Sequence, residues 1–316
     1  MCNDVLLFDD TGELLPDGQV VAPHRGPARM PAFSSRTLPA TARDSAPSTS
    51  VEGTRGQERA HTSRVHNYLL GGKTNYLVDR AAGDAVSAAF GSISLAVLAG
   101  QTYAHRVARH LARQGARQFI ELGVGLPLQP HLHDTVQAAA TADTSTLYID
   151  NDPIALAYAD TLLTDLTTGR SHVMEADVRD PEGLLAAVRE HGSIDLDRPV
   201  VLLAHALLDF IPDDEDPCGV VAGMLRGIPP GSYFSLTHSA ADLAPQAWAA
   251  AADAYGRHGI ALHPRTGEKV ERFLTGLDPV GPRLTTAHRW HPGSGRTPGS
   301  VTEQQAPLYA GAGRTP

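Results

Sequence analysis

The sequence predicts an α/β fold in which a doubly wound parallel sheet carries helices on both faces. An apolar run over 117–121 leads into a Gly-x-Gly turn, which fits the first strand of such a sheet. Strand-like and helical segments then alternate, the pattern of parallel strands joined by right-handed crossovers. Residues 199–204 are apolar throughout, as expected for a strand that is buried on both faces.

Composition divides the 316 residues into three parts. Residues 1–60 are rich in Pro, Ser, Thr, Arg and Gly without sustained periodicity, so we expect a mostly disordered tail with one short strand at 4–10. Residues 61–115 contain three expected helices, each followed by a glycine. These helices are expected to begin at Ser63, Asp79 and about Ser94. Residues 116–316 carry the alternating strands and helices.

The elements of this third part follow from local pattern. Strands are expected over 117–121, 146–149, 172–176, 199–204 and 232–238. Helices are expected over 153–163, from 180 onward, and over 215–226, 244–258 and 266–274. Two late strands, within 280–290 and at 307–310, would form an antiparallel hairpin at the edge of the sheet.

Charge and cysteine content exclude several classes of function. The formal net charge of −9 argues against a nucleic-acid or membrane-surface partner, because both need clustered Lys and Arg. Cys2 and Cys218 provide neither a disulfide framework nor a CxxC metal site. We find no apolar run of about 18 residues and no leader pattern, so a cytoplasmic protein is expected. The oligomeric state is left open.

Three acidic residues close successive expected strands. Glu121, Asp150 and Asp177 each follow an apolar run, and Glu121 joins the turn that contains Gly123 and Gly125. In an open parallel sheet the ligand lies beyond the carboxyl ends of the strands, so these residues should meet there. The arrangement predicts a nucleotide-type ligand.

Two cofactors fit such a turn. A dinucleotide fingerprint needs a third glycine, where this chain has Leu128, and a helix that starts directly after it. S-adenosylmethionine instead needs open backbone, a carboxylate for the ribose hydroxyls and an acceptor for the adenine amino group. Gly123 and Gly125 would supply the open backbone. Asp150 would bind the ribose, and Asp177 would bind the adenine.

Five segments also carry a resemblance to a known family. They are Arg64–Tyr76, Glu121–Pro127, Tyr148–Pro153, Ala176–Pro181 and Tyr309–Arg314. Through them the chain resembles the S-adenosylmethionine-dependent methyltransferase family that is abundant in actinobacteria and was long classed as a domain of unknown function. The first segment is very specific to that family, and the match extends from about Ser63 to the end.

The resemblance implies a class I methyltransferase fold (Rossmann-like) with a seven-stranded sheet whose last strand runs antiparallel. Residues 61–115 would form an N-terminal helical cap, and residues 116–316 the domain that binds S-adenosylmethionine as cofactor. The residues assigned to that cofactor are Glu121, Gly123, Gly125, Asp150, Asn151, Asp177 and Val178. The family commonly has Tyr-Asp in place of His66-Asn67, Asp in place of Thr74 and His in place of Asp209. These departures leave the cofactor site intact and concern the acceptor side.

The hallmark segment admits two interpretations. A Gly71-Gly72 break flanked by aromatic residues could serve as a lid, with Tyr68 and Asn75 in contact with the cofactor. The alternative is a helix–turn–helix whose tyrosines belong to the core. We favour the lid because this segment is the family's hallmark.

Candidate catalytic residues follow the fourth and fifth strands. Methyl transfer is a direct displacement, so alignment supplies much of the rate, and a general base is needed only for a poor nucleophile such as a hydroxyl. His238 and His205 are the candidate bases, and the alternative is a hydrogen-bonded histidine at a strand end. His131 and His133 lack an HExxH pattern or a Cys partner, so no metal site is predicted.

The sequence therefore predicts an S-adenosylmethionine-dependent methyltransferase whose acceptor is unidentified, with a small metabolite as the expected class. Two alternatives stay open. One is an NAD-dependent oxidoreductase, and the other is a regulatory protein that binds S-adenosylmethionine without catalysis.

Overall fold

The computed structural model describes residues 13–14, 20–21, 58–163, 170–290 and 301–316. Contacts divide the chain into two units, residues 1–53 and 54–316. In the first unit, β1 (Glu13–Leu14) pairs with β2 (Val20–Val21) in antiparallel fashion. The strand expected at 4–10 and most of the expected tail lie outside the described residues.

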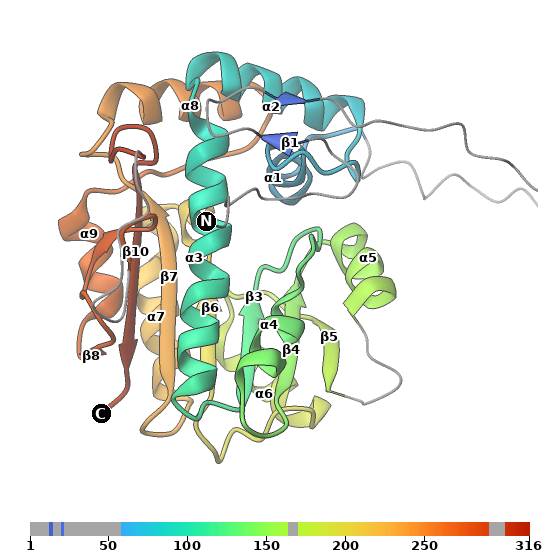
Figure 1. The fold of residues 1–316 in the computed structure, drawn as a ribbon, viewed down its shortest axis with the longest axis vertical. Helices are drawn as coiled ribbons and strands as arrows, with labels where there is room; N and C mark the ends of the chain where they lie inside the picture. Colours follow the sequence, from blue (N-terminus) through green and yellow to red (C-terminus); the bar gives the residue numbers. More distant parts are fainter. Residues whose placement is uncertain (1–12, 15–19, 22–57, 164–169, 291–300) are drawn as a thin grey trace, which may run out of the picture. The chain divides into compact units, whose positions relative to one another are not determined.

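The second unit is built on one sheet, which the described residues arrange in the order β5-β4-β3-β6-β7-β10-β8 (Figure 1). Its strands are β3 (Gln118–Leu122), β4 (Ser145–Asp150), β5 (Ser171–Glu175), β6 (Val201–Ala204), β7 (Tyr233–Ser239), β8 (Asp278–Pro279), β9 (Thr285–Thr286) and β10 (Leu308–Arg314). Strands β3 to β7 are parallel, and the strand order reverses between β3 and β6. The predicted α/β class and its antiparallel last strand, β10, are confirmed.

The edge of the sheet departs from the seven-stranded expectation. One edge of β10 pairs with β7 along seven residue pairs, and its other edge pairs with two short strands, β8 and β9. Strands β8 and β9 contain only two residues each. With both of them counted, the described sheet has eight strands rather than seven. The late strand expected within 280–290 is thus largely replaced by turns.

Helices cover both faces of the sheet. They are α1 (Thr62–Leu69), α2 (Leu77–Ala89), α3 (Ile93–Arg113), α4 (Leu132–Ala139), α5 (Pro153–Leu163), α6 (Pro181–His191), α7 (Pro217–Arg226), α8 (Pro245–Arg257) and α9 (Gly267–Glu271). Short 3₁₀ helices are η1 (Leu208–Phe210), η2 (Asp213–Glu215) and η3 (Arg272–Leu274). Alternation along β3 shows the two layers, since Phe119 packs with α3, α4 and α5 while Ile120 packs with α6, α7 and η3.

The three helices expected to form one cap do not stay together in the structure. Helix α3 runs along the sheet (Figure 1), where Tyr103 and Leu111 are buried against it, so α3 belongs to the sheet layers. Helices α1 and α2 pack instead with α8, from the C-terminal part of the chain, around Val65, Val86 and Trp248. We call α1, α2 and α8 the cap. A segment so distant in sequence could not be joined to it by local pattern.

Local capping chemistry explains the starts of α6 and α7 and one correction. Asp180 and Asp216 accept hydrogen bonds from backbone N–H groups at the starts of α6 and α7, each directly before a proline. Asp79 was expected to precede α2, but it is the third residue of that helix and accepts from the N–H of Tyr76 (2.8 Å). Within the described residues no single helix has the length and apolarity of a membrane span, and α2 with α3 meets that criterion only as a pair bent by 106°.

Candidate functional site

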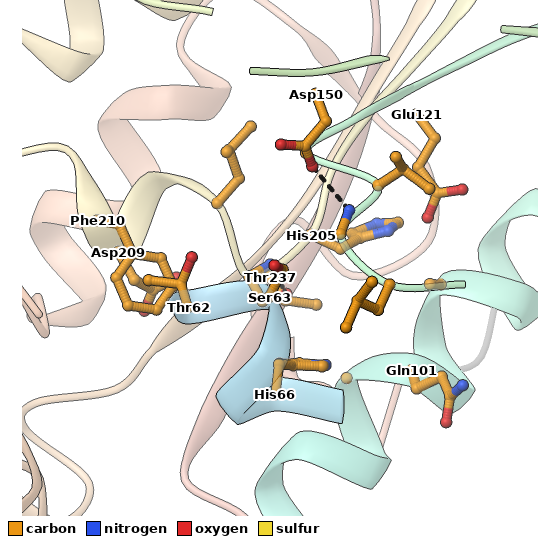
Figure 2. Close-up of a pocket in the computed structure, with 18 of the residues that line it drawn as sticks. Thr62, Ser63, His66, Gln101, Glu121, Asp150, His205, Asp209, Phe210 and Thr237 are labelled. Atoms are coloured by element: carbon orange, nitrogen blue, oxygen red, sulfur yellow. Dashed lines mark hydrogen bonds between the residues drawn. The ribbon is translucent and has the colours of Figure 1, made fainter. Parts of the chain in front are cut away.

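A cavity of about 390 Å³ opens at the carboxyl ends of the central strands, where the strand order reverses. Figure 2 shows its labelled side chains in two groups. Glu121, Asp150 and His205 lie on one side, while Asp209 and Phe210 lie on the other. Residues of α1 stand between these groups, so the cap helix forms part of the wall.

Asp150 lies in the floor of the cavity and is held by backbone donors. Its Oδ2 accepts from the N–H of Gly125 (2.8 Å), the bond dashed in Figure 2, and its Oδ1 accepts from the N–H groups of Asn151 (2.8 Å) and Asp152 (2.9 Å). The side chain is only 8% exposed. These bonds fix the carboxylate at the end of β4 before any ligand arrives.

The turn after β3 requires its two glycines. Gly123 and Gly125 have φ values of +70° and +60°, which residues other than glycine rarely adopt. A Cβ on Gly123 would also lie 2.8 Å from Leu207 Cδ1, and one on Gly125 would lie 3.1 Å from Ser63 Cβ. The bare backbone of this turn therefore passes close to η1 and to α1.

Glu121 comes one residue before the end of β3 and lines the same cavity. Burial raises the pKa of its carboxyl to about 7. A cationic group beside it would restore the charged form, because an opposite charge lowers the pKa of an acid.

Asp177 follows β5 and lines the same cavity, together with Asn151 and Val178. Its Oδ2 accepts from Asn151 Nδ2 (3.3 Å) and from Arg179 Nη2 (2.6 Å). The hydrogen bond from Arg179 lowers the pKa of Asp177. Asp177 is thus a half-buried carboxylate with a fixed orientation.

His205 follows β6 and has one nitrogen with a defined proton. Tyr103 donates its only hydroxyl proton to Gly311 O (2.9 Å), so Ser235 must donate to Tyr103 Oη (2.8 Å). The remaining contact, between His205 Nε2 and Ser235 Oγ (3.0 Å), then requires Nε2–H to donate. Nδ1 of His205 therefore carries the lone pair, and within the described residues it is buried without a partner.

Burial also keeps His205 neutral, since it lowers the pKa of the imidazole to about 3. The unpartnered Nδ1 belongs to a side chain that lines the cavity, so it can accept a hydrogen bond from a ligand there.

A second group of lining residues escaped the sequence reasoning. Trp248 and Tyr255 come from α8, Phe210 from η1, and His66 from α1. One signal was present in α1 and at its C-cap, where Ser63, His66 and Leu70 recur at helical spacing and all line the cavity. For α8 no local signal existed, because only the fold brings it over the sheet.

Comparison with known proteins assigns the family. Residues 49–316 match the model of a family described as S-adenosyl methyltransferase. The chain belongs to this family. Residues 1–26 match a second model, described as a family of unknown function. A comparison with curated proteins finds no match.

Two solved structures are similar over most of the chain. A DUF574 family protein from Streptomyces avermitilis has 34% identity, covers 82% of this chain and 99% of its own, and superposes with a TM-score of 0.77. A protein from Thermobifida fusca, provisionally described as a methyltransferase, has 28% identity, covers 84% of this chain and 99% of its own, and has a TM-score of 0.74.

Membership of the S-adenosyl methyltransferase family confirms the resemblance seen in the sequence, and S-adenosylmethionine is the cofactor. The residues present fit that cofactor, because bare backbone at the glycine turn adjoins the carboxylates of Asp150 and Asp177 in one cavity. A dinucleotide fits less well. Helix α4, the first helix after the turn, begins only at Leu132, seven residues after Gly125, so it does not begin directly after the glycines as the dinucleotide fingerprint requires.

The residues proposed for the lid, Tyr68 and Asn75, are not among those that line the cavity. Tyr68 donates to Asp84 Oδ1 (2.7 Å), and its ring packs on Gly83 of α2. Asn75 donates to Asn67 Oδ1 (3.0 Å) and to Gly72 O (2.8 Å). We therefore revise the assignment of both residues to the cofactor, since their contacts build the α1–α2 turn of the cap.

His238 is likewise engaged elsewhere. It is fully buried in β7, and its Nδ1–H donates to Ser239 O (3.1 Å) while its Nε2 accepts from Arg265 Nη1 (2.9 Å). Both nitrogens are thus occupied, and His238 does not line the cavity. We remove it from the candidate bases.

Three possible metal ligands come together beside the cavity. Ligand atoms of His131, His133 and Asp134 lie within 4.8 Å of one another. Tyr148 Oη lies 2.9 Å from His133 Nδ1, which leaves Nε2 of that ring to face Asp134 (3.5 Å). The sequence spacing had not predicted this cluster as a metal site.

Proposed function

We propose that this chain transfers a methyl group from S-adenosylmethionine to a small-molecule acceptor by direct displacement. The observation that carries the proposal is the continuity of the cavity. It extends from Asp150, Asp177 and His205 on one side to a compartment lined by His66, Phe210 and Tyr255 on the other. A non-catalytic cofactor-binding protein would not need this second compartment, so its presence favours catalysis.

The roles of the residues follow from their chemistry. Asp150 binds the two ribose hydroxyls, Asp177 accepts from the adenine amino group, and Glu121 pairs with the amino group of the methionine portion. When bound, S-adenosylmethionine supplies a methyl group on a positively charged sulfur, which leaves as a neutral thioether with the electron pair of the broken bond. The cap excludes water from the reacting groups, because α1 and α8 cover the cavity.

We assign the general base to His205. The acceptor uses its lone pair to bond the methyl carbon, becomes more acidic as it does so, and gives its proton to Nδ1. A pKa of about 3 makes His205 a weak base, but it also keeps Nδ1 unprotonated throughout the neutral range. Ser235 and Tyr103 hold the ring in the required tautomer.

Calorimetry tests the cofactor part of the proposal. S-adenosylhomocysteine is expected to bind at micromolar concentrations and NADH is not. Binding of NADH in place of S-adenosylhomocysteine would contradict the proposed function.

Cell extract and labelled S-adenosylmethionine test the catalytic part. The wild type is expected to label a small metabolite. His205→Gln should slow labelling by about 100-fold to 10,000-fold, the usual contribution of a general base, with S-adenosylhomocysteine affinity within about twofold. His191→Gln, at an exposed position of α6, is the matched control. An unchanged rate in His205→Gln would remove the base but leave the methyltransferase proposal in place.

A further inference from the structure

The compartment beyond the cofactor residues combines aromatic walls with one carboxylate. Phe210 and Tyr255 meet edge to face, with ring centroids 6.3 Å apart. Trp248 and Leu262 line the same region. Asp209 is the acidic residue among these walls, and it is only 3% exposed.

Only one of the two carboxylate oxygens of Asp209 accepts a hydrogen bond from the described residues. Its Oδ1 accepts from the N–H of Ser239 (2.7 Å). His238 Nδ1 lies 3.4 Å from the same oxygen, but its proton is directed to Ser239 O (3.1 Å). Within the described residues Oδ2 is buried and has no partner. A buried carboxylate in this state favours a ligand that donates to Oδ2.

The titratable neighbours of Asp209 do not neutralise it. Burial lowers the pKa of His66 to about 4, although the Asp209 carboxylate acts in the opposite direction, so His66 is uncharged at neutral pH. Burial raises the pKa of Tyr255, which keeps its phenol protonated. Arg265 contacts Nε2 of His238 rather than Asp209, and its Nε donates a hydrogen bond to Asp213 Oδ1 (2.9 Å).

We propose that the methyl acceptor carries a cationic nitrogen, which binds Oδ2 of Asp209 against the rings of Phe210 and Tyr255. A carboxylate with a free oxygen and aromatic walls is the chemistry that holds ammonium groups. This inference rests on the proposed function, because an acceptor exists only if methyl transfer occurs. It assigns the charged group that anchors the acceptor, whichever atom receives the methyl group.

Wild-type protein saturated with S-adenosylhomocysteine provides the first test. The probes are 2-phenylethylamine, which is a cation at neutral pH, and 2-phenylethanol, its neutral counterpart of similar size. We expect the amine to bind roughly tenfold to a hundredfold more tightly by calorimetry, the value of a charge-assisted hydrogen bond. Equal affinities, or no saturable binding of the amine, would overturn the inference.

Asp209→Asn provides the second test, with Asp253→Asn as its matched control, since Asp253 is exposed on α8. Asp209→Asn should lose the preference for the amine and keep its affinity for the alcohol, while Asp253→Asn should bind like the wild type. A preserved preference in Asp209→Asn would refute the assignment.

The two proposals fail in different ways. If S-adenosylhomocysteine does not bind the wild type, the proposed function fails. If it binds and the amine shows no preference, only the cationic acceptor fails. Should Asp209→Asn not fold, as judged by thermal unfolding, the comparison of the two probes on the wild type decides alone.

Discussion

The two ends of the cavity are built on different principles. At the cofactor end, Asp150 is held by three backbone N–H groups and Asp177 by Arg179. At the acceptor end, Asp209 Oδ2 has no partner in the described part of the chain, and Nδ1 of His205, the proposed base, has none either. The carboxylates of Asp150 and Asp177 are thus held by donors of the chain itself, while Asp209 Oδ2 at the acceptor end needs a ligand to satisfy it. This difference predicts how each end responds to substitution.

The largest effect is expected at the glycine turn. Gly125→Val places a branched side chain at a φ of +60° and a Cβ 3.1 Å from Ser63 Cβ. Strain and lost backbone access together should weaken S-adenosylhomocysteine binding by roughly a hundredfold or more in calorimetry. Gly91→Val is the control, because a Cβ there meets nothing within 4 Å. Retained affinity in Gly125→Val would show that the turn does not contact the cofactor.

Asp150→Asn comes next in size. The amide keeps the shape of the side chain, but its NH₂ group would face backbone N–H groups that donate to the carboxylate in the wild type. It also lacks the negative charge that is proposed to bind the ribose hydroxyls. We expect S-adenosylhomocysteine affinity to fall roughly tenfold to a hundredfold. Asp253→Asn should leave it unchanged. An unaltered Kd in Asp150→Asn would place the ribose elsewhere.

A smaller effect concerns the stability of the cofactor-free protein. The pKa of Glu121 is raised from 4.5 in the unfolded chain to about 7 in the fold, so the folded state binds the proton more tightly. Its contribution to stability is complete below about pH 4.5 and is lost as the pH rises through about 7. Urea unfolding from about pH 5 to about pH 8 should show the wild type losing about 2–3 kcal/mol relative to Glu121→Gln. Parallel pH profiles would mean that Glu121 is not buried as a free acid.

The smallest effect is expected in the cap turn. Tyr68→Phe removes the hydrogen bond to Asp84, which is exposed, and leaves the ring on Gly83. S-adenosylhomocysteine affinity should change by less than about twofold. A tenfold loss would restore Tyr68 as a cofactor contact and erase the distinction between the cap turn and the cavity.

Sequence reasoning found the cofactor end more fully than the acceptor end. Glu121, Asp150 and Asp177 could be grouped in advance because parallel strands bring their carboxyl ends to one edge of a sheet. His205 was found for the same reason. Tyr68 and Asn75 were assigned to the cofactor because they belong to a hallmark segment, yet their neighbours Gly83 and Asn67 show that they hold a turn together.

The sequence by itself determined the type and order of the elements, because these depend on period, capping and turn residues within a few positions. Helix α5 shows this, since both of its ends agree with the expectation. Only the tertiary structure decided which residues share the cavity and in which state. The tautomer of His205 depends on Tyr103, Ser235 and Gly311, which are far apart in the chain. The physical reason is that such contacts follow from strand order and helix packing, which leave no periodic trace in the sequence.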